Sequence, residues 1–185
     1  MNIIVKTNGS GLCHCRPDTT WERENKDFYA PDCVNEVHWA PVLFARICKA
    51  GKCVGEKFAS RYYDAVGFGA LLYIGDFMPD MAAASCADHT SLLPFPLYNP
   101  VVIENEENTY EVLKNGEGIY TYASADAGLI AQAVCDASRL TSLRIGDFVA
   151  VELEQPKPLA SRAEGGIALK ATYCENELYD IKLIF

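Results

Sequence analysis

The sequence has no apolar run near the roughly 20 residues that a membrane-spanning helix needs. Its opening residues, MNIIVKTNGSG, also lack the apolar segment of a secretory signal. Basic residues are scarce, because 16 lysines and arginines face 25 aspartates and glutamates, for a net charge of −9. Since an acidic surface repels phosphate, we exclude nucleic acid and anionic membranes as partners and expect an acidic, cytoplasmic protein.

Several motifs that carry chemistry are missing. The chain contains no GxGxxG, Walker, HExxH or GxSxG pattern. The segment Cys13-His14-Cys15 is the nearest approach to a metal motif, but in an extended chain the histidine faces away from both cysteines. We therefore interpret the eight cysteines mainly as free thiols, several of them buried, rather than as a zinc site or disulfides.

What is present is an ordinary globular composition. With 185 residues, half of them hydrophobic, the chain is long enough for one domain, which we assign to residues 1–185. Apolar spacing predicts helices at about 56–66 and 124–140, the second capped by Ser124. Asn115-Gly116 lies between two strand-like runs and predicts a tight hairpin. Further strands are expected at 2–5, 38–48, 70–74, 143–153, 166–173 and 178–185, with an edge or a bulge at Pro41. These elements predict a strand-rich α+β fold.

From Arg16 onward the sequence resembles the fumarylacetoacetate hydrolase family, in the short single-domain form found in many bacteria. The resemblance covers about a third of the chain and implies mixed β-sheets in a roll or sandwich. It is weaker later on, at Lys114-Asn115-Gly116 and at Leu143 to Asp147. The matching stretches are Arg16 to Thr20, Asp27 to Pro31, His38-Trp39, Arg46 to Cys53, Glu56 to Asp64, Gly67, Gly69 and Asp76-Phe77.

Members of that family bind magnesium or manganese through three carboxylates, a Glu-x-Glu pair and an aspartate. The resemblance places these ligands at Ala40, Val42 and Leu71, and an arginine of the family at Gly75. Only the aspartate of the same phrase, Asp76, is retained. Because a hard cation needs oxygen ligands, we expect no metal cofactor here.

The resemblance departs from the family elsewhere too. The family's opening segment with its acid–base histidine is absent, so the chain is interpreted as truncated at its N-terminus. The Gly-Thr-Pro phrase is replaced near Ala150 to Leu153, and the family's lysine before the Asp88 region is missing, since Ala82 to Cys86 reads Ala-Ala-Ala-Ser-Cys. These losses favour a non-catalytic relative, or pseudoenzyme, that binds a small ligand or an intact family enzyme and forms a homodimer.

Two alternatives remain open. In the first, the protein is an enzyme with relocated chemistry, for which Asp76, Asp88, His89 or a cysteine are the candidate catalytic residues. In the second, it is an intact hydrolase, decarboxylase or isomerase of 1,3-dicarbonyl or 2-oxo acid substrates, and the ligand positions above are misaligned. A trio of close carboxylates would favour the second alternative, and a polar cleft would favour the first.

Overall fold

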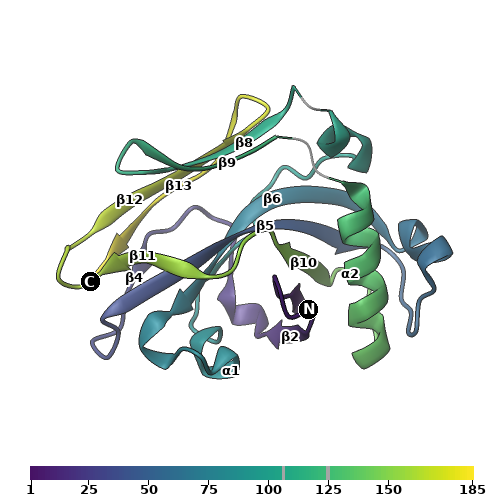
Figure 1. The fold of residues 1–185 in the computed structure, drawn as a ribbon, viewed down its shortest axis with the longest axis horizontal. Helices are drawn as coiled ribbons and strands as arrows, with labels where there is room; N and C mark the ends of the chain where they lie inside the picture. The colour runs from purple at the N-terminus through teal and green to yellow at the C-terminus, as the bar shows by residue number, and fades with distance from the viewer. Residues whose placement is uncertain (106, 124–125) are drawn as a thin grey trace.

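The computed structural model describes residues 1–105, 107–123 and 126–185, which form two β-sheets and a few helices (Figure 1). The strands of the larger sheet are β1 (Ile3–Lys6), β2 (Cys13–Arg16), β3 (Trp21–Glu22), β5 (Glu36–Ile47), β6 (Tyr63–Ile74), β7 (Ser91–Leu92), β10 (Phe148–Glu152) and β11 (Lys157–Ser161). They follow the order β2-β1-β10-β5-β6-β7-β3, and β11 also pairs with β5. The long antiparallel pair of β5 and β6 is the centre of this sheet.

The smaller sheet covers one face of the larger one (Figure 1). Its strands are β4 (Phe28–Tyr29), β8 (Thr109–Lys114), β9 (Glu117–Ala123), β12 (Ile167–Tyr173) and β13 (Asn176–Ile184), in the order β4-β13-β12-β8-β9. The predicted hairpin joins β8 to β9, and φ is positive at both turn residues, 51° at Asn115 and 85° at Gly116. The strand-rich α+β prediction is thereby confirmed.

The main helix is α2 (Ala127–Leu140), which packs beside β10 and β1. It confirms the helix predicted at 124–140, but its N-cap is Asp126, whose carboxylate accepts a 2.7 Å hydrogen bond from the Gly128 N–H. The predicted cap, Ser124, lies outside the described residues. The short helix α1 (Met81–Ala84) precedes β7, and no helix of the described part is long and apolar enough to span a bilayer.

The helix predicted at 56–66 is wrong. Residues Glu56–Arg61 form a 3-10 helix, and β6 begins at Tyr63. The apolar residues that gave the helical spacing belong to two elements, because long pairing with β5 outweighs local helical preference. Gly67 and Gly69 do not end a helix but lie within β6, where a Cβ at Gly69 would collide with the Leu92 backbone oxygen.

The prediction of an edge or bulge at Pro41 is also wrong, since β5 is central and buried there. On one side β5 pairs with β6 throughout, including Pro41 opposite Ala70. On its other side β10 pairs from position 42 and β11 up to position 39, so Pro41 lies between the two partners. Its carbonyl accepts a 2.9 Å hydrogen bond from Leu153, and the gap in the ladder tolerates the missing N–H.

Alternation along β5 divides the apolar core between the two faces of the large sheet. Val37, Trp39 and Leu43 belong to the main core, which includes residues of the smaller sheet and of α2. Ala40, Val42 and Phe44 point to the opposite face and belong to a second buried cluster. That face is covered by the segments around β2 and α1 (Figure 1), and it holds the positions singled out by the sequence.

Candidate functional site

The structure brings together the three positions that the resemblance assigns to metal ligands. Ala40 lies opposite Leu71 on the neighbouring strand, and Val42 follows on the same face of β5. All three side chains are fully buried, with exposed fractions of 0%. They share the second cluster with apolar residues of β1 and β10, among them Ile3 and Phe148. This part of the fold is therefore packed apolar core.

A divalent cation does not fit these residues. Magnesium and manganese are held by oxygen ligands, and Ala40, Val42 and Leu71 have none on their side chains. Across the described residues, no three His, Cys, Asp or Glu side chains converge as a metal site would require.

Gly75 and Asp76 follow β6 and serve the local backbone. A Cβ at Gly75 would lie 2.7 Å from the His38 ring, so a side chain at the family's arginine position would force its neighbours to move. The Asp76 carboxylate accepts hydrogen bonds from the Asn35 side chain at 2.9 Å and from the Asn35 and Glu36 N–H groups at 2.7 and 3.0 Å. The bonds from Asn35 and Glu36 lower the pKa of Asp76, which fits an exposed turn-stabilising carboxylate.

A buried polar cluster that we did not predict lies beside the apolar positions. Arg16 of β2 is 2% exposed, and its guanidinium donates to the carbonyls of Ser85 at 3.1 Å and Leu72 at 2.6 Å. It also lies 4.8 Å from the centre of the Tyr73 ring. The Tyr73 hydroxyl in turn donates a hydrogen bond to the carboxylate of Glu152. Arginine, tyrosine and glutamate thus form one network inside the protein.

Burial controls the ionisation of this cluster. It raises the pKa of Glu152, although the hydrogen bond from Tyr73 acts in the opposite direction. Burial, together with the nearby Arg16 charge, also lowers the pKa of His14 to about 4, so the imidazole is neutral at pH 7. In the described part of the chain, both ring nitrogens of His14 and Nη1 of Arg16 are buried without a hydrogen-bond partner.

The sequence carried only faint signals of this network. Arg16 opens the first stretch that resembles the family, and β-strand alternation places His14 on the same face. Glu152 lies where the family's Gly-Thr-Pro phrase is replaced. The prediction that Cys13 and Cys15 face away from His14 agrees with the strand that these residues form.

The other two candidate residues lie in the loop before β7. Asp88 is exposed, whereas His89 contacts the carboxylate of Glu22 with a 2.7 Å distance from Nδ1 to Oε2. Asp76 bonds instead to the start of β5, so hydrogen bonding does not join the three candidates into one catalytic group. Glu22 on β3 was not singled out by the sequence, where it appeared as one acidic residue in a charged stretch.

Comparison with solved structures decides the fold. The chain matches a protein ascribed to the fumarylacetoacetate hydrolase family from Yersinia pestis CO92 with a TM-score of 0.78 and 16% identity, covering 99% of this chain and 92% of that one. This chain has the fumarylacetoacetate hydrolase fold. No protein-family model matches the sequence, and no curated protein matches it either.

Two further neighbours have this fold and carry named activities. Fumarylpyruvate hydrolase from Pseudomonas aeruginosa, solved with Mn²⁺ and pyruvate, matches with a TM-score of 0.78 and 15% identity over 100% of this chain and 90% of that one. The 5-carboxymethyl-2-hydroxymuconate delta-isomerase from Mycobacterium smegmatis matches with a TM-score of 0.79 and 14% identity over 99% and 78%. At such identities the likeness extends to the fold, and function has to be argued from the site.

Proposed function

We propose that this protein is a non-catalytic relative of the fumarylacetoacetate hydrolase enzymes, and that it acts by binding a small ligand without a divalent metal. The observation that carries the proposal is the full burial of Ala40, Val42 and Leu71 in one apolar cluster. In a metal-dependent enzyme of this kind the ion polarises the substrate carbonyl, and that chemistry needs ligands and an open coordination position. The packed apolar side chains of Ala40, Val42 and Leu71 supply neither metal ligands nor an open coordination position.

The first test is metal binding. Isothermal titration of the purified protein with millimolar magnesium or manganese is expected to show no stoichiometric site. A tight site that disappears when Asp76 is replaced by asparagine would overturn the proposal, because Asp76 is the only carboxylate of the family phrase that remains. Asp180→Asn is the control variant, since this exposed carboxylate lies on β13 in the smaller sheet.

The second candidate function is an enzyme of the same reaction class with relocated residues. It is favoured by the neighbours, which include a hydrolase and an isomerase, and by the contact between His89 and Glu22, which resembles an acid–base pair. Such an enzyme would hydrolyse, decarboxylate or isomerise 1,3-dicarbonyl or 2-oxo acid substrates.

Steady-state assays distinguish the two candidates. The non-catalytic proposal expects no hydrolysis of acylpyruvates and no decarboxylation of oxaloacetate above background, with or without added manganese. A rate that survives a chelator and disappears in His89→Gln would establish the relocated enzyme. A rate abolished by the chelator would instead show that the metal positions are misaligned.

A further inference from the structure

A buried carboxylate holds an exposed histidine at the edge of the large sheet. Glu22 is only 4% exposed, and its Oε1 accepts a 2.6 Å hydrogen bond from the Glu24 N–H. Its Oε2 lies 2.7 Å from Nδ1 of His89, whose side chain is 51% exposed. The parallel pairing of β3 with β7 brings the two residues together. Because an ionised carboxylate only accepts hydrogen bonds, Nδ1 donates, and Nε2 is directed away from Glu22.

The backbone of His89 is also unusual. Its φ of 60° lies in the left-handed region, which a side chain other than glycine adopts at a cost of about 1 kcal/mol or more. Its N–H donates to the Thr19 carbonyl at 3.3 Å. This conformation and the contact with Glu22 hold the imidazole in one place. Strained, oriented histidines with one free nitrogen are typical of sites that handle a ligand.

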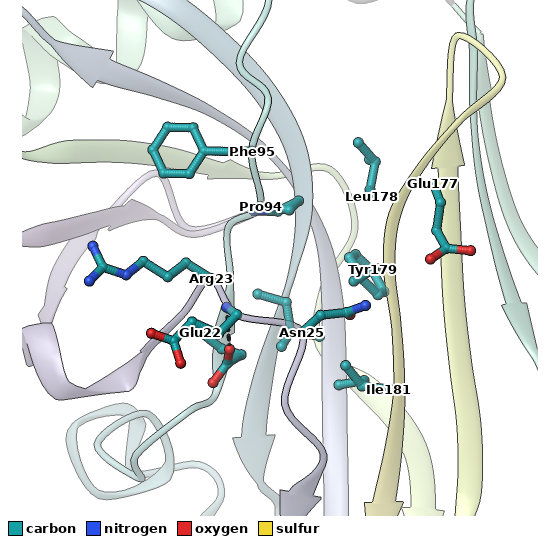
Figure 2. A pocket seen from close by; sticks show the side chains of 11 residues that line it. Glu22, Arg23, Asn25, Pro94, Phe95, Glu177, Leu178, Tyr179 and Ile181 are labelled. Carbon is teal, nitrogen blue, oxygen red and sulfur yellow. Dashed lines mark hydrogen bonds between the residues drawn. The ribbon is translucent and has the colours of Figure 1, made fainter.

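The exposed side chain of His89 lies at a hollow on the protein surface. His89, Trp21 and Arg23 line a cavity of about 390 Å³, within the range of small-molecule sites. A second hollow of about 260 Å³ adjoins it between β3 and β13, and Figure 2 shows Arg23 extending away from the Leu178 and Ile181 side of that hollow. The two hollows share the segment from Glu22 to Glu24.

Charge at the larger hollow indicates what it could bind. The Arg23 guanidinium lies 5.0 Å from the centre of the Trp21 ring and has no ion pair in the described part of the chain. The lysine that lines the hollow, Lys26, is already paired with Glu24 at 2.5 Å. Arg23 is therefore an arginine without an ion pair among the described residues of the hollow, and its planar fork suits a carboxylate. The carboxylates of Asp18, Glu22 and Glu24 also line the hollow and would repel a second negative charge.

We propose that this hollow binds a small monocarboxylic acid with a hydroxyl group next to the carboxylate. Arg23 binds the carboxylate, Nε2 of His89 accepts the hydrogen bond from the hydroxyl, and Trp21 contacts the hydrocarbon part. Glu22 is a positioning residue, because it acts only through His89. The site gives the proposed binding function a ligand class, yet it uses none of the positions 40, 42 and 71. If this ligand proposal fails, the metal-binding and activity tests described above are unaffected.

Calorimetry with mandelate as the probe tests the ligand class. Mandelate is expected to bind with one site per chain and at least tenfold more tightly than phenylacetate, which lacks the hydroxyl, or mandelamide, which lacks the carboxylate. Malate, with a second carboxylate, is expected to bind at least tenfold more weakly than mandelate. Equal binding of mandelate, phenylacetate and mandelamide, or no binding of mandelate, would overturn the proposal.

Variants then locate the site. Arg23→Gln and His89→Gln are each expected to weaken mandelate binding at least tenfold, whereas Arg139→Gln, which removes an exposed arginine of α2, is expected to leave it unchanged. If Arg23→Gln and His89→Gln both bind like the parent, the ligand is elsewhere and the proposal fails.

The positioning role of Glu22 has its own readout. In the parent, ¹⁵N NMR is expected to show a proton on Nδ1 of His89. In Glu22→Gln the tautomers are expected to mix and mandelate binding to weaken, because the amide no longer requires a donor at Nδ1. An unchanged tautomer and unchanged affinity in a folded Glu22→Gln protein would contradict the role given to Glu22.

Discussion

Replacing Val42 with glutamate tests whether this position, which the resemblance assigns to a metal ligand, is dry core. The side chain is 0% exposed and lies between β6 and β10, opposite Gly69 and Glu152. An uncompensated buried charge costs about 3–5 kcal/mol, against a total stability of about 5–15 kcal/mol for a typical domain. For a chain of this size each kcal/mol lowers Tm by about 2–4 °C, so we expect a fall of about 6–20 °C.

The matched control is Val101→Glu, which makes the same substitution at a side chain that is 71% exposed. Surface changes of this kind usually stay within about 0.5 kcal/mol. Thermal melts of the parent and both variants at pH 8 give the comparison. If Val42→Glu melts within 2–3 °C of Val101→Glu, a difference of about 1 kcal/mol, position 42 is open to water and our placement of the site is wrong.

Restoring all three carboxylates extends the test. In the protein with Ala40→Glu, Val42→Glu and Leu71→Asp, burial and mutual repulsion raise the folded-state pKa values of the new carboxyls above their unfolded values. Raised carboxyl pKa values make stability fall as pH rises through them, so the variant should melt higher at pH 5 than at pH 8. Magnesium at 100 times its Kd would recover about 2.7 kcal/mol at pH 8 if the site re-forms.

The remaining predictions concern other buried groups and the assembly. Tyr73→Phe removes the hydroxyl that donates to Glu152 and should cost about 1–3 kcal/mol in urea unfolding. The pKa of Glu152 is raised from 4.5 by burial, and the hydrogen bond from Tyr73 lowers it, so removing that bond raises the pKa further. The destabilisation caused by Tyr73→Phe should therefore grow as pH rises through the pKa of Glu152, and a pH-independent destabilisation would contradict this. The pKa of His14 falls from 6.5 to about 4, so parent stability should decline as pH drops through that range by up to about 1.4 kcal/mol per pKa unit, and His14→Phe should abolish this component. Gly69→Ala should destabilise by at least about 1–3 kcal/mol in the same assay, since its Cβ meets the Leu92 backbone. Light scattering should give twice the chain mass of 20.4 kDa for the expected homodimer, and a value near 20.4 kDa in dilute solution would contradict it.

Strands and turns with a strong local signal could be predicted from the sequence. The Asn115-Gly116 hairpin follows from two positive φ values that few residue pairs adopt cheaply. The segment after Glu56 could not be predicted, because its apolar spacing suits a helix, while the preference for β6 comes from a partner strand distant in sequence. Pro41 was misinterpreted for the same reason, since a gap between β10 and β11 is a property of the sheet and not of the local sequence.

At the site, too, some residue positions could be predicted from the sequence and others could not. The resemblance to a known family placed Ala40, Val42 and Leu71 together, which the register of β5 and β6 confirms. The contact between Glu22 and His89 could not be predicted from the sequence, because it depends on the parallel pairing of β3 with β7. Each of these strands has only two residues.

Strand alternation explains how this fold can hold apolar residues at the positions that the resemblance assigns to metal ligands. Along β5 the residues that hold the smaller sheet and α2, such as Trp39 and Leu43, alternate with those on the opposite face. Substitution of the second set leaves the contacts of the first unchanged, because the side chains project to opposite sides of the same backbone. Replacing a cluster of like charges with alanine, valine and leucine also removes the need for a cation to offset their repulsion. The architecture can thus be kept with apolar side chains on the second face, and the binding site that we propose lies at another edge of the sheet, beside β3 and β7.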